Sequence, residues 1–220
     1  MVHSHEQDHD HHSHEGVIAA QDGPLTHYQI METALRELLI EKGVFTADDV
    51  RREVELMEGR NPGRGARMVA RAWVDPAYKQ RLLTDANEAA AELGFEAGAF
   101  RILVMENTPA VHNLIVCTLC SCYPRTLLGL PPAWYKSLSY RSRAVREPRA
   151  VLREFGTVLP DDVEVRVHDS SADIRYLVLP KRPSGTEHMT EEELAQLVTR
   201  DSLIGVTQAR EPQRTPALAS

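Results

Sequence analysis

Cysteine and aromatic residues are scarce in this chain of 220 residues. Only 5% of the residues are aromatic, and the three cysteines, Cys117, Cys120 and Cys122, all fall within six positions. Cysteines this close together cannot form the disulfide framework that joins distant parts of a small secreted fold. They therefore indicate a local chemical site.

Long apolar runs and an excess of basic residues are also missing. The sequence contains no run of about 18 apolar residues, the length that a membrane-spanning helix needs, and its first residues do not resemble a signal peptide. We therefore expect a soluble, cytoplasmic protein that does not bind membranes. The formal net charge of -7 argues against nucleic-acid binding, because neutralising phosphates requires a basic surface.

The N-terminal residues are rich in histidine. Residues 1–15 carry six of the ten histidines, interleaved with Asp and Glu. Such a segment has little to bury, so we expect residues 1–23 to be a disordered tail. Two roles stay open for it: capture of metal ions for a site elsewhere in the chain, and a solubilising extension.

Residues 24–98 have the apolar spacing of helices. Tyr28, Met31 and Leu35 fall on one face of a first helix that Gly43 would end. Further helices are predicted over residues 46–60, 67–73 and 76–94, the last with a kink. Because the region has few aromatic and many charged residues, we expect a helical arm that contacts a partner chain.

Residues 99–206 change in character to short β-branched and aliphatic runs. Strands are predicted over residues 100–105, 113–116, 163–167, 174–179 and 202–206, and helices over residues 139–155, interrupted at Pro148, and 190–200. The predicted fold class is thus α/β or α+β, with one domain at 99–206. We expect residues 207–220 to be a flexible tail.

The cysteines lie on a loop after the strand predicted at 113–116. A zinc site needs four ligands, and the sequence offers no second cysteine pair and no histidine at finger spacing. A redox dithiol has no use for a third cysteine. Both interpretations fit poorly but stay open.

A trivalent metal is a third interpretation of the loop. The sulfurs of Cys120 and Cys122 and the backbone nitrogens of Ser121 and Cys122 can surround one ion in a plane, with Cys117 capping one side. Thiolates and deprotonated amides suit a low-spin trivalent transition metal. An open position opposite Cys117 would be typical of a hydrolytic or hydrating site.

The residues around the loop resemble those of nitrile hydratase α subunits. The motif Cys117-Thr118-Leu119-Cys120-Ser121-Cys122, followed by Leu128-Gly129-Leu130-Pro131-Pro132-Ala133-Trp134-Tyr135-Lys136, carries the resemblance, which extends in order over about residues 25–206. Further segments that resemble the family are Ala72-Trp73-Val74-Asp75-Pro76, Tyr140-Arg141-Ser142-Arg143 and Asp169-Ser170-Ser171. The resemblance implies an extended helical N-terminal arm and a layered α-β-β-α C-terminal domain, so that residues 99–206 would be the metal-binding catalytic domain.

The resemblance also implies a chemistry for the loop. Thr118 is typical of the family's cobalt type, so the implied cofactor is a non-corrin Co(III), with Fe(III) as the alternative. By position, Cys117 is the axial thiolate and Cys120 the cysteine oxidised to sulfinate. Cys122 is the cysteine oxidised to sulfenate and a candidate nucleophile, and Ser121 and Cys122 add backbone nitrogens. A bound cation keeps thiols deprotonated, which is their oxidisable form.

The implied reaction is hydration of a small nitrile to its amide, and it requires a second chain. The resemblance implies a β subunit, whole or split into two chains, in an α2β2 heterotetramer. Two arginines of this partner would hold the oxidised sulfurs. A metallochaperone or activator would load the cobalt.

One departure from the family bears on the substrate. Nitrile hydratases usually carry Trp three residues after the last cysteine, whereas this chain has Arg125. A guanidinium there would favour an anionic or hydrogen-bonding substrate, and thiocyanate hydrolase γ subunits, which share the motif, resemble this chain in that respect. The alternative is that Arg125 points to solvent or pairs with the partner.

Three functions therefore stand side by side. They are nitrile hydration, thiocyanate hydrolysis to carbonyl sulfide and ammonia, and metal delivery or storage by the histidine-rich tail. His112, beside the strand that leads into the motif, is predicted to be a hydrogen-bonded structural histidine. The remaining departures from the family are interpreted as packing or interface variation: His168, Glu187, His188 and Met189.

Overall fold

A computed structural model of the chain describes residues 26–212. The predicted histidine-rich tail and most of the predicted C-terminal tail lie outside these residues. The chain divides into two compact units after Arg51, and each unit is described by itself. Among the described residues, no helix is both long enough and apolar enough to cross a membrane.

The first unit consists of α1, His27–Glu41, and the start of α2, Ala47–Glu58. Thr26 caps α1 through a reciprocal pair of hydrogen bonds with Gln29, and Gly43 follows α1 in the left-handed conformation that its position predicted. None of the residues of α1 is buried. Within residues 26–212, its predicted apolar face is therefore not covered.

The second unit begins with three helices, α3 at Gly63–Val74, α4 at Pro76–Thr84 and α5 at Ala86–Glu92. Asp75 accepts hydrogen bonds from the first backbone N–H groups of α4, and Asp85 does the same for α5. Such N-caps satisfy donors that a helix cannot satisfy itself. The kink predicted between residues 76 and 94 is thus the cap at Asp85.

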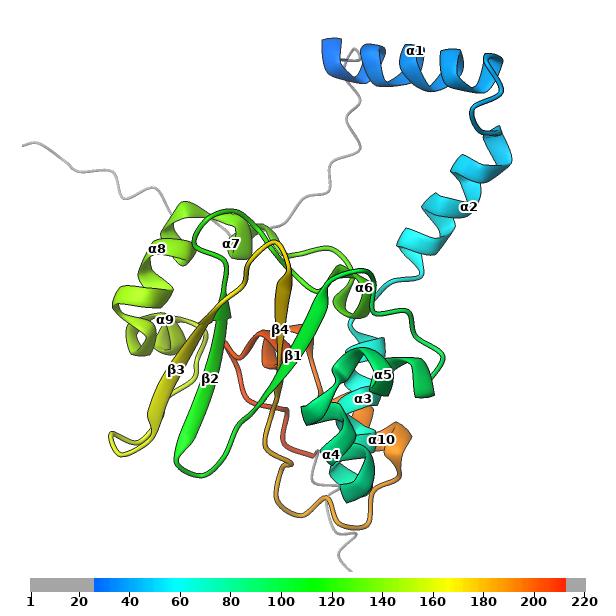
Figure 1. Cartoon of the computed structure of the whole chain (residues 1–220). Helices are drawn as coiled ribbons and strands as arrows, with labels where there is room; N and C mark the ends of the chain where they lie inside the picture. The colour runs from blue at the N-terminus through cyan, green and yellow to red at the C-terminus, as the bar shows by residue number, and fades with distance from the viewer. Residues whose placement is uncertain (1–25, 213–220) are drawn as a thin grey trace, which may run out of the picture. The chain divides into compact units, whose positions relative to one another are not determined.

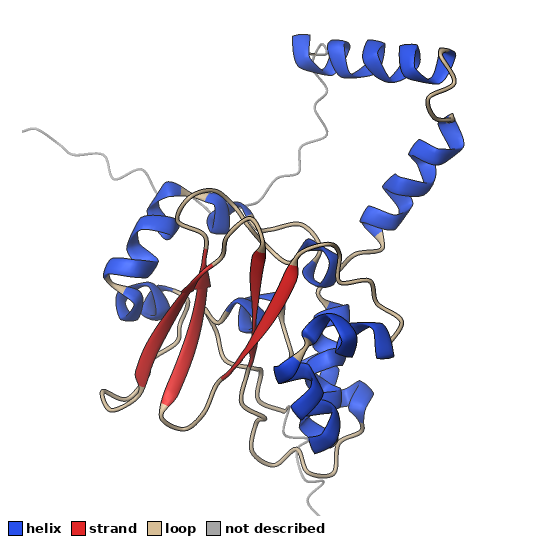
Figure 2. Cartoon of the chain, viewed as in Figure 1, coloured by secondary structure: helices blue, strands red, loops and turns tan. Residues whose placement is uncertain are grey.

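Four strands form two parallel pairs (Figure 2). Strand β1, Arg101–Glu106, pairs with β4, Ile174–Leu179, and strand β2, Val111–Val116, pairs with β3, Glu164–Asp169. In the second pair Val116 lies opposite Asp169. This register brings the end of β3 beside the start of the cysteine loop, and the four interior strand predictions are confirmed within one or two residues.

Helices cover both pairs of strands. Helices α7, α8 and α9, at Ala133–Lys136, Leu138–Arg146 and Pro148–Glu154, lie beside the β2–β3 pair, and α3, α4, α5 and α10, Glu191–Leu197, lie beside the β1–β4 pair (Figure 1). The short helix α6, Arg125–Leu128, follows the cysteine loop. The order of layers agrees with the predicted α-β-β-α domain.

The strand predicted over residues 202–206 is wrong. Residues Arg200–Ile204 form α11, which Thr199 and Ser202 open with a capping box and which Gly205 ends in the left-handed conformation. The run Leu203–Val206 is short and fully buried, and a short buried run of this kind has no periodicity that separates a strand from a helix.

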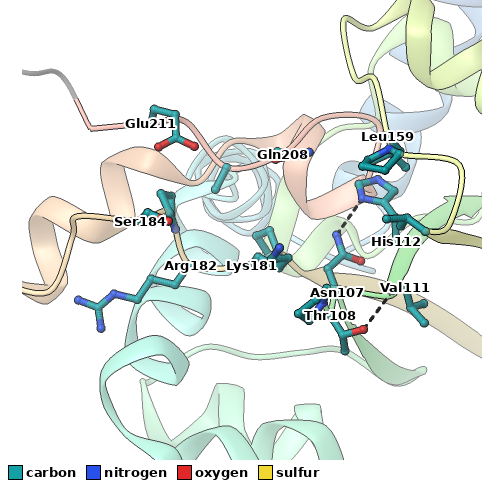
Figure 3. Close-up of a pocket in the computed structure, with 16 residues that line it drawn as sticks. Asn107, Thr108, Val111, His112, Leu159, Lys181, Arg182, Ser184, Gln208 and Glu211 are labelled. Atoms are coloured by element: carbon teal, nitrogen blue, oxygen red, sulfur yellow. Dashed lines mark hydrogen bonds between the residues drawn. The ribbon is translucent and has the colours of Figure 1, made fainter.

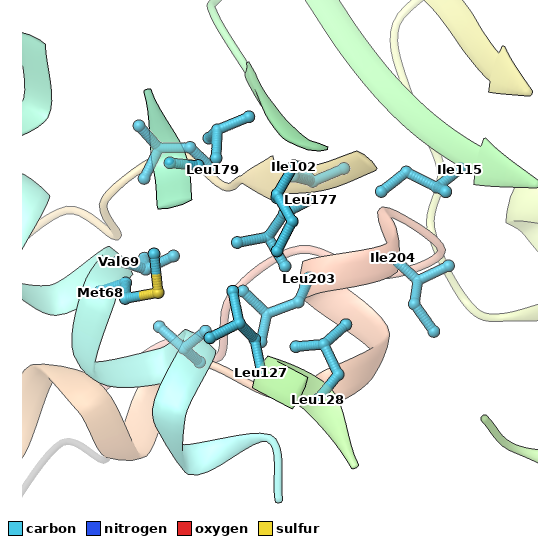
Figure 4. Packing of buried hydrophobic residues seen from close by; sticks show 14 of the residues in the cluster. Met68, Val69, Ile102, Ile115, Leu127, Leu128, Leu177, Leu179, Leu203 and Ile204 are labelled. Atoms are coloured by element: carbon cyan, nitrogen blue, oxygen red, sulfur yellow. The ribbon is translucent and has the colours of Figure 1, made fainter. Parts of the chain in front are cut away.

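The core joins the helices of residues 63–92 to the strands. Met68 and Val69 of α3 are fully buried and belong to the same hydrophobic cluster as Ile102 and Leu177 (Figure 4). A Cβ added at Gly65 would lie 2.9 Å from side-chain atoms of neighbouring leucines, so α3 packs very closely. The small side chains of α3 permit this close approach. From the sequence alone, α3 was expected to belong to the helical arm of residues 24–98.

Candidate metal centre

The cysteine loop begins where β2 ends. Val116 is the last residue of the strand, Cys117 follows it, and the loop runs to Pro124 before α6 begins at Arg125. The strand end is a frequent location for a site because the scaffold is rigid and the loop is free to present its groups. Cys117 is fully buried, Cys120 is exposed and Cys122 lies between them in exposure.

The fold gathers the three sulfurs. The distance from Cys120 Sγ to Cys117 Sγ is 3.4 Å and to Cys122 Sγ is 3.1 Å, and all three atoms lie within 4.8 Å of one another. The backbone N–H groups of Ser121 and Cys122 also interact with the Cys120 sulfur. Three thiols and two backbone nitrogens are thus concentrated on one small loop, which fits a soft transition-metal ion.

Cys120 and Cys122 differ in acidity. Hydrogen bonds from Cys122 and then from Cys117 lower the pKa of Cys120 to about 7, and nearby backbone N–H groups act in the same direction. Burial raises the pKa of Cys122 to about 12. The exposed Cys120 therefore loses its proton more readily than Cys122, which needs a bound cation to become a thiolate at neutral pH.

Asp169 and Arg141 hold the beginning of the loop. The Asp169 carboxylate accepts a 2.9 Å hydrogen bond from the backbone N–H of Thr118 and a 2.5 Å bond from the Thr118 hydroxyl. Arg141 Nε donates to the carbonyl of Cys117 over 3.1 Å, and Nη2 donates to the carbonyl of Thr118 over 2.7 Å. Thr118 is therefore fixed on both sides, directly after the buried cysteine.

One tyrosine holds the end of the loop, and a second holds the strand that leads into it. The Tyr135 hydroxyl donates to the carbonyl of Cys122 over 2.8 Å, and the Tyr140 hydroxyl donates to the carbonyl of Ile115 over 2.6 Å. Both rings are buried. Burial raises the pKa of each tyrosine above its ordinary value, so both hydroxyls keep the proton that they donate.

The roles of these supporting residues were not predictable from local sequence patterns. Tyr135, Arg141 and Asp169 lie within segments that resemble the family, but only the tertiary structure brings them to the loop. Their presence in three separate matching segments was the available signal.

Arg125 opens α6 with an exposed side chain. Within residues 26–212 its guanidinium forms no hydrogen bond or ion pair, so the predicted role in substrate selection stays a prediction. His168, in contrast, has a structural contact, because its Nε2 lies 2.8 Å from Asn113 Oδ1. This contact agrees with its interpretation as packing variation.

His112 has the structural role that the sequence predicted. Its Nε2 lies 2.7 Å from the carbonyl oxygen of Gly205, and its Nδ1 lies 3.4 Å from the side-chain nitrogen of Asn107. A pocket of about 230 Å³ lies next to this group, and its lining includes Lys181 and Arg182 but none of the three cysteines (Figure 3). That pocket is therefore separate from the metal loop.

The fold and the thiol cluster define an α/β protein with a loop suited to a transition metal. The family model described as "Nitrile hydratase, alpha chain" matches residues 26–207. This chain belongs to the nitrile hydratase α-chain family, which confirms the resemblance found in the sequence.

Individual relatives agree with this membership. The chain is 54% identical over 185 residues to the low-molecular weight cobalt-containing nitrile hydratase subunit alpha of Rhodococcus rhodochrous, covering 82% of this chain and 88% of that protein. It is 45% identical over 191 residues to the thiocyanate hydrolase subunit gamma of Thiobacillus thioparus, covering 81% and 79%. The family therefore includes relatives of two named activities.

Solved structures also resemble this fold. A recombinant thiocyanate hydrolase with partially modified cobalt centres superposes with a TM-score of 0.79 at 42% identity, covering 90% of this chain and 98% of that chain. A double mutant of the Fe-type nitrile hydratase from Comamonas testosteroni Ni1 superposes with a TM-score of 0.78 at 43% identity, covering 88% and 98%.

Proposed function

We propose that this chain is the metal-bearing α subunit of an enzyme that hydrates a small nitrile to its amide at a non-corrin Co(III) centre. The observation that carries the proposal is the group of three sulfurs within 4.8 Å, in a chain that is 54% identical to a cobalt-containing nitrile hydratase subunit. Fe(III) is the alternative metal, since an Fe-type enzyme also shares the fold.

The proposed ligands are the sulfurs of Cys117, Cys120 and Cys122 and the backbone nitrogens of Ser121 and Cys122. When bound, the metal supplies a Lewis acid that polarises the nitrile. Cys117 approaches from the buried side of the loop, and Cys120 lies on the exposed side. We propose that Cys120 becomes a sulfinate and Cys122 a sulfenate, with Cys122 or water providing the attacking oxygen.

The hydrogen bonds around the loop support this proposal. Asp169 and Arg141 fix both faces of Thr118, and Tyr135 fixes the carbonyl of Cys122. A metal ion with an open position needs ligands that cannot move to fill it, so a loop held at both ends is suited to the task. The residues that support the loop thus prepare it for the metal.

The partner is a β subunit, in one or two chains, and we propose an α2β2 heterotetramer. Leu119, between two of the cysteines, is 87% exposed, and Leu130 and Leu138 are also largely exposed. Exposed leucines at a metal loop are typical of a surface that another chain covers. We expect two partner arginines to hold the oxidised sulfurs and a metallochaperone to load cobalt. We also expect the helical arm predicted over residues 24–98 to contact the partner through α1, which has no buried residue.

Arg125 favours the second candidate function, hydrolysis of thiocyanate. An unpaired guanidinium three residues after the last cysteine provides a charge that an anion would use. The 45% identity to a thiocyanate hydrolase γ subunit supports the same candidate.

Turnover by the cobalt-loaded complex tests the two functions. The complex of this chain with its partner should convert a small nitrile to the amide, and Arg125→Trp should raise nitrile turnover relative to any thiocyanate turnover. Arg101→Gln, an exposed strand arginine, is the matched control. If the loaded complex consumes neither substrate, both enzyme proposals fail.

Mass spectrometry tests the proposed oxidation states, and a deletion tests the tail. The peptide carrying the loop should contain two additional oxygens at Cys120 and one at Cys122 in an active preparation, whereas bound zinc and unoxidised cysteines would contradict the site. Removal of residues 1–15 should lower cobalt loading if the tail delivers metal. Unchanged loading would leave the tail without that role.

A further inference from the structure

A cleft at the start of α3 carries positive charge that the metal loop does not use. It encloses about 520 Å³ between the beginning of α3, the end of α10 and the segment that follows α11. Three arginines line it, Arg64, Arg67 and Arg210, and among its described lining residues none carries a carboxylate. The cysteines of the metal loop do not line it.

Phe95 orients two of these arginines. The guanidinium carbon of Arg67 lies 5.1 Å from the centre of the Phe95 ring, and that of Arg64 lies 5.8 Å from it. Arg64 also donates through Nη1 to the carbonyl of Thr126 over 3.2 Å. A guanidinium against an aromatic ring keeps its N–H edge available for an oxyanion, so the two forks are arranged before a ligand arrives.

The arginines of the cleft are not neutralised by ion pairs in the described part of the chain. No residue whose side chain the structure describes forms an ion pair with Arg64, Arg67 or Arg210. Other arginines of the same unit are paired: Arg81 with Glu92, Arg143 with Glu147 and Glu154, and Arg166 with Glu164. The cleft therefore brings together three arginines without ion pairs in a protein whose net charge is -7.

The backbone fixes the third arginine and adds to the field. The N–H of Arg210 donates to the carbonyl of Leu197 over 2.8 Å, which ties the segment after α11 to the edge of the cleft. The 12-residue helix α3 begins at Gly63, another lining residue, and a helix N-terminus carries partial positive charge. This field reinforces the arginines but would not define a site without them.

We propose that this cleft binds a small anion that carries a phosphate or diphosphate group. Guanidinium groups match the geometry of phosphate oxygens in bidentate pairs. The volume of the cleft falls in the range of small-ligand sites, which is about 300–1,000 Å³. The site involves none of the metal ligands, so the proposal is independent of the proposed function.

Calorimetric titration of the intact complex with inorganic pyrophosphate tests the proposal. At constant ionic strength we expect saturable binding at one site per chain with a Kd below about 1 mM. Arg67→Gln and Arg210→Gln should each weaken binding about tenfold, because each removes a charge-assisted contact. Arg101→Gln, an exposed arginine outside the cleft, should leave the affinity unchanged.

Two results would overturn the proposal. The first is the absence of saturable binding, or equal affinity in the wild type and in the Arg67→Gln/Arg210→Gln double variant. The second has two parts. The wild-type complex does not bind pyrophosphate, and the double variant loses its partner subunit more readily than the wild type in sedimentation measurements. That second result would assign the arginines to acidic side chains of the partner. Because neither measurement requires turnover, both remain informative if the enzyme proposal fails.

Discussion

The two ends of strand β2 carry residues of the kinds that bind metals, yet only one end is suited to a metal. At the end of the strand, the sulfurs of Cys117, Cys120 and Cys122 lie together, and Cys120 is exposed. At its beginning, His112 is buried, and both ring nitrogens already have partners in Gly205 and Asn107.

The two ends differ in which atoms already have hydrogen-bond partners within the fold. Around the cysteine loop, Asp169 and Arg141 bind backbone atoms and the Thr118 hydroxyl, which leaves the sulfurs to face one another. Around His112 the fold satisfies the side chain itself. A buried polar group with all its partners stabilises a fold, whereas three sulfurs that face one another, one of them exposed, can bind an ion together.

Replacing a ligand should have the largest effect. Cys117→Ser removes the buried sulfur, and we expect metal content to fall below about one tenth of the wild-type value, with activity falling at least as far, because a hydroxyl is a poor ligand for a soft site. Metal analysis and nitrile turnover of the purified complex measure both. Ser121→Ala is the matched control, since it keeps the backbone nitrogen that we propose as a ligand. Equal metal content in Cys117→Ser and the wild type would remove Cys117 from the site.

Replacing Gly205, which packs against β2, should have the next largest effect, and the property affected is the stability of the fold. A Cβ at Gly205 would lie 2.0 Å from the carbonyl oxygen of Asn113, and Gly205 has φ 89°. We expect Gly205→Ala to lower the free energy of unfolding by more than about 3 kcal/mol. Gly156→Ala has a similar φ of 81° but open space around the added Cβ, so it should cost about 1–2 kcal/mol.

Urea titrations of the two glycine variants provide the comparison. If both variants lose the same stability, backbone conformation alone would explain the cost. The space between Gly205 and β2 would then accommodate the added Cβ, contrary to the short distance in the structure.

Replacing a residue that holds the loop but is not a metal ligand should have an intermediate effect on metal binding. Arg141→Gln removes the bonds to the carbonyls of Cys117 and Thr118. Residues that orient metal ligands typically contribute about 10- to 100-fold to metal affinity or activity, so we expect the bound metal to be released to a chelator at least about tenfold faster. Arg146→Gln, on the same helix, is the control because, among the described residues, its guanidinium bonds only to Ser142. Identical release rates in both variants would show that Arg141 does not hold the loop.

The smallest effect should be a pH dependence at the beginning of β2. Burial lowers the pKa of His112 below its ordinary value, although its bond to the Gly205 carbonyl opposes the shift. Below the ordinary pKa of about 6.5, the unfolded chain therefore takes up a proton that the folded chain does not, and stability falls as the pH decreases. For one proton the slope is at most about 1.4 kcal/mol per pH unit.

Urea midpoints between pH 5 and pH 7 measure this slope. The slope should be smaller in His112→Gln. His168→Gln is the comparison, because burial also lowers the pKa of His168, which is less buried than His112. A slope that does not change in His112→Gln would assign the acid sensitivity to other groups.

The sequence by itself determined the local features of this protein. The helix start at Thr190 was predicted because its capping box is encoded within four consecutive residues, and the structure adds a second box of the same kind at Thr26. The four interior strands were predictable from their aliphatic and β-branched runs. The metal loop was predictable as a site because its three cysteines lie within six positions, and the family resemblance identified the chemistry.

Only the tertiary structure decided what surrounds and supports the loop. Asp169 lies 51 positions from Thr118, and Arg141 lies 23 positions from it, so no local pattern records either contact. The parallel register of β2 and β3 brings Asp169 to the loop. The same holds for α3, whose place in the core depends on distant leucines, and for the run predicted as a strand over residues 202–206, of which residues 202–204 belong to α11. Local hydrogen-bonding patterns are encoded in neighbouring residues, whereas these contacts arise from the packing of segments that are far apart in the chain.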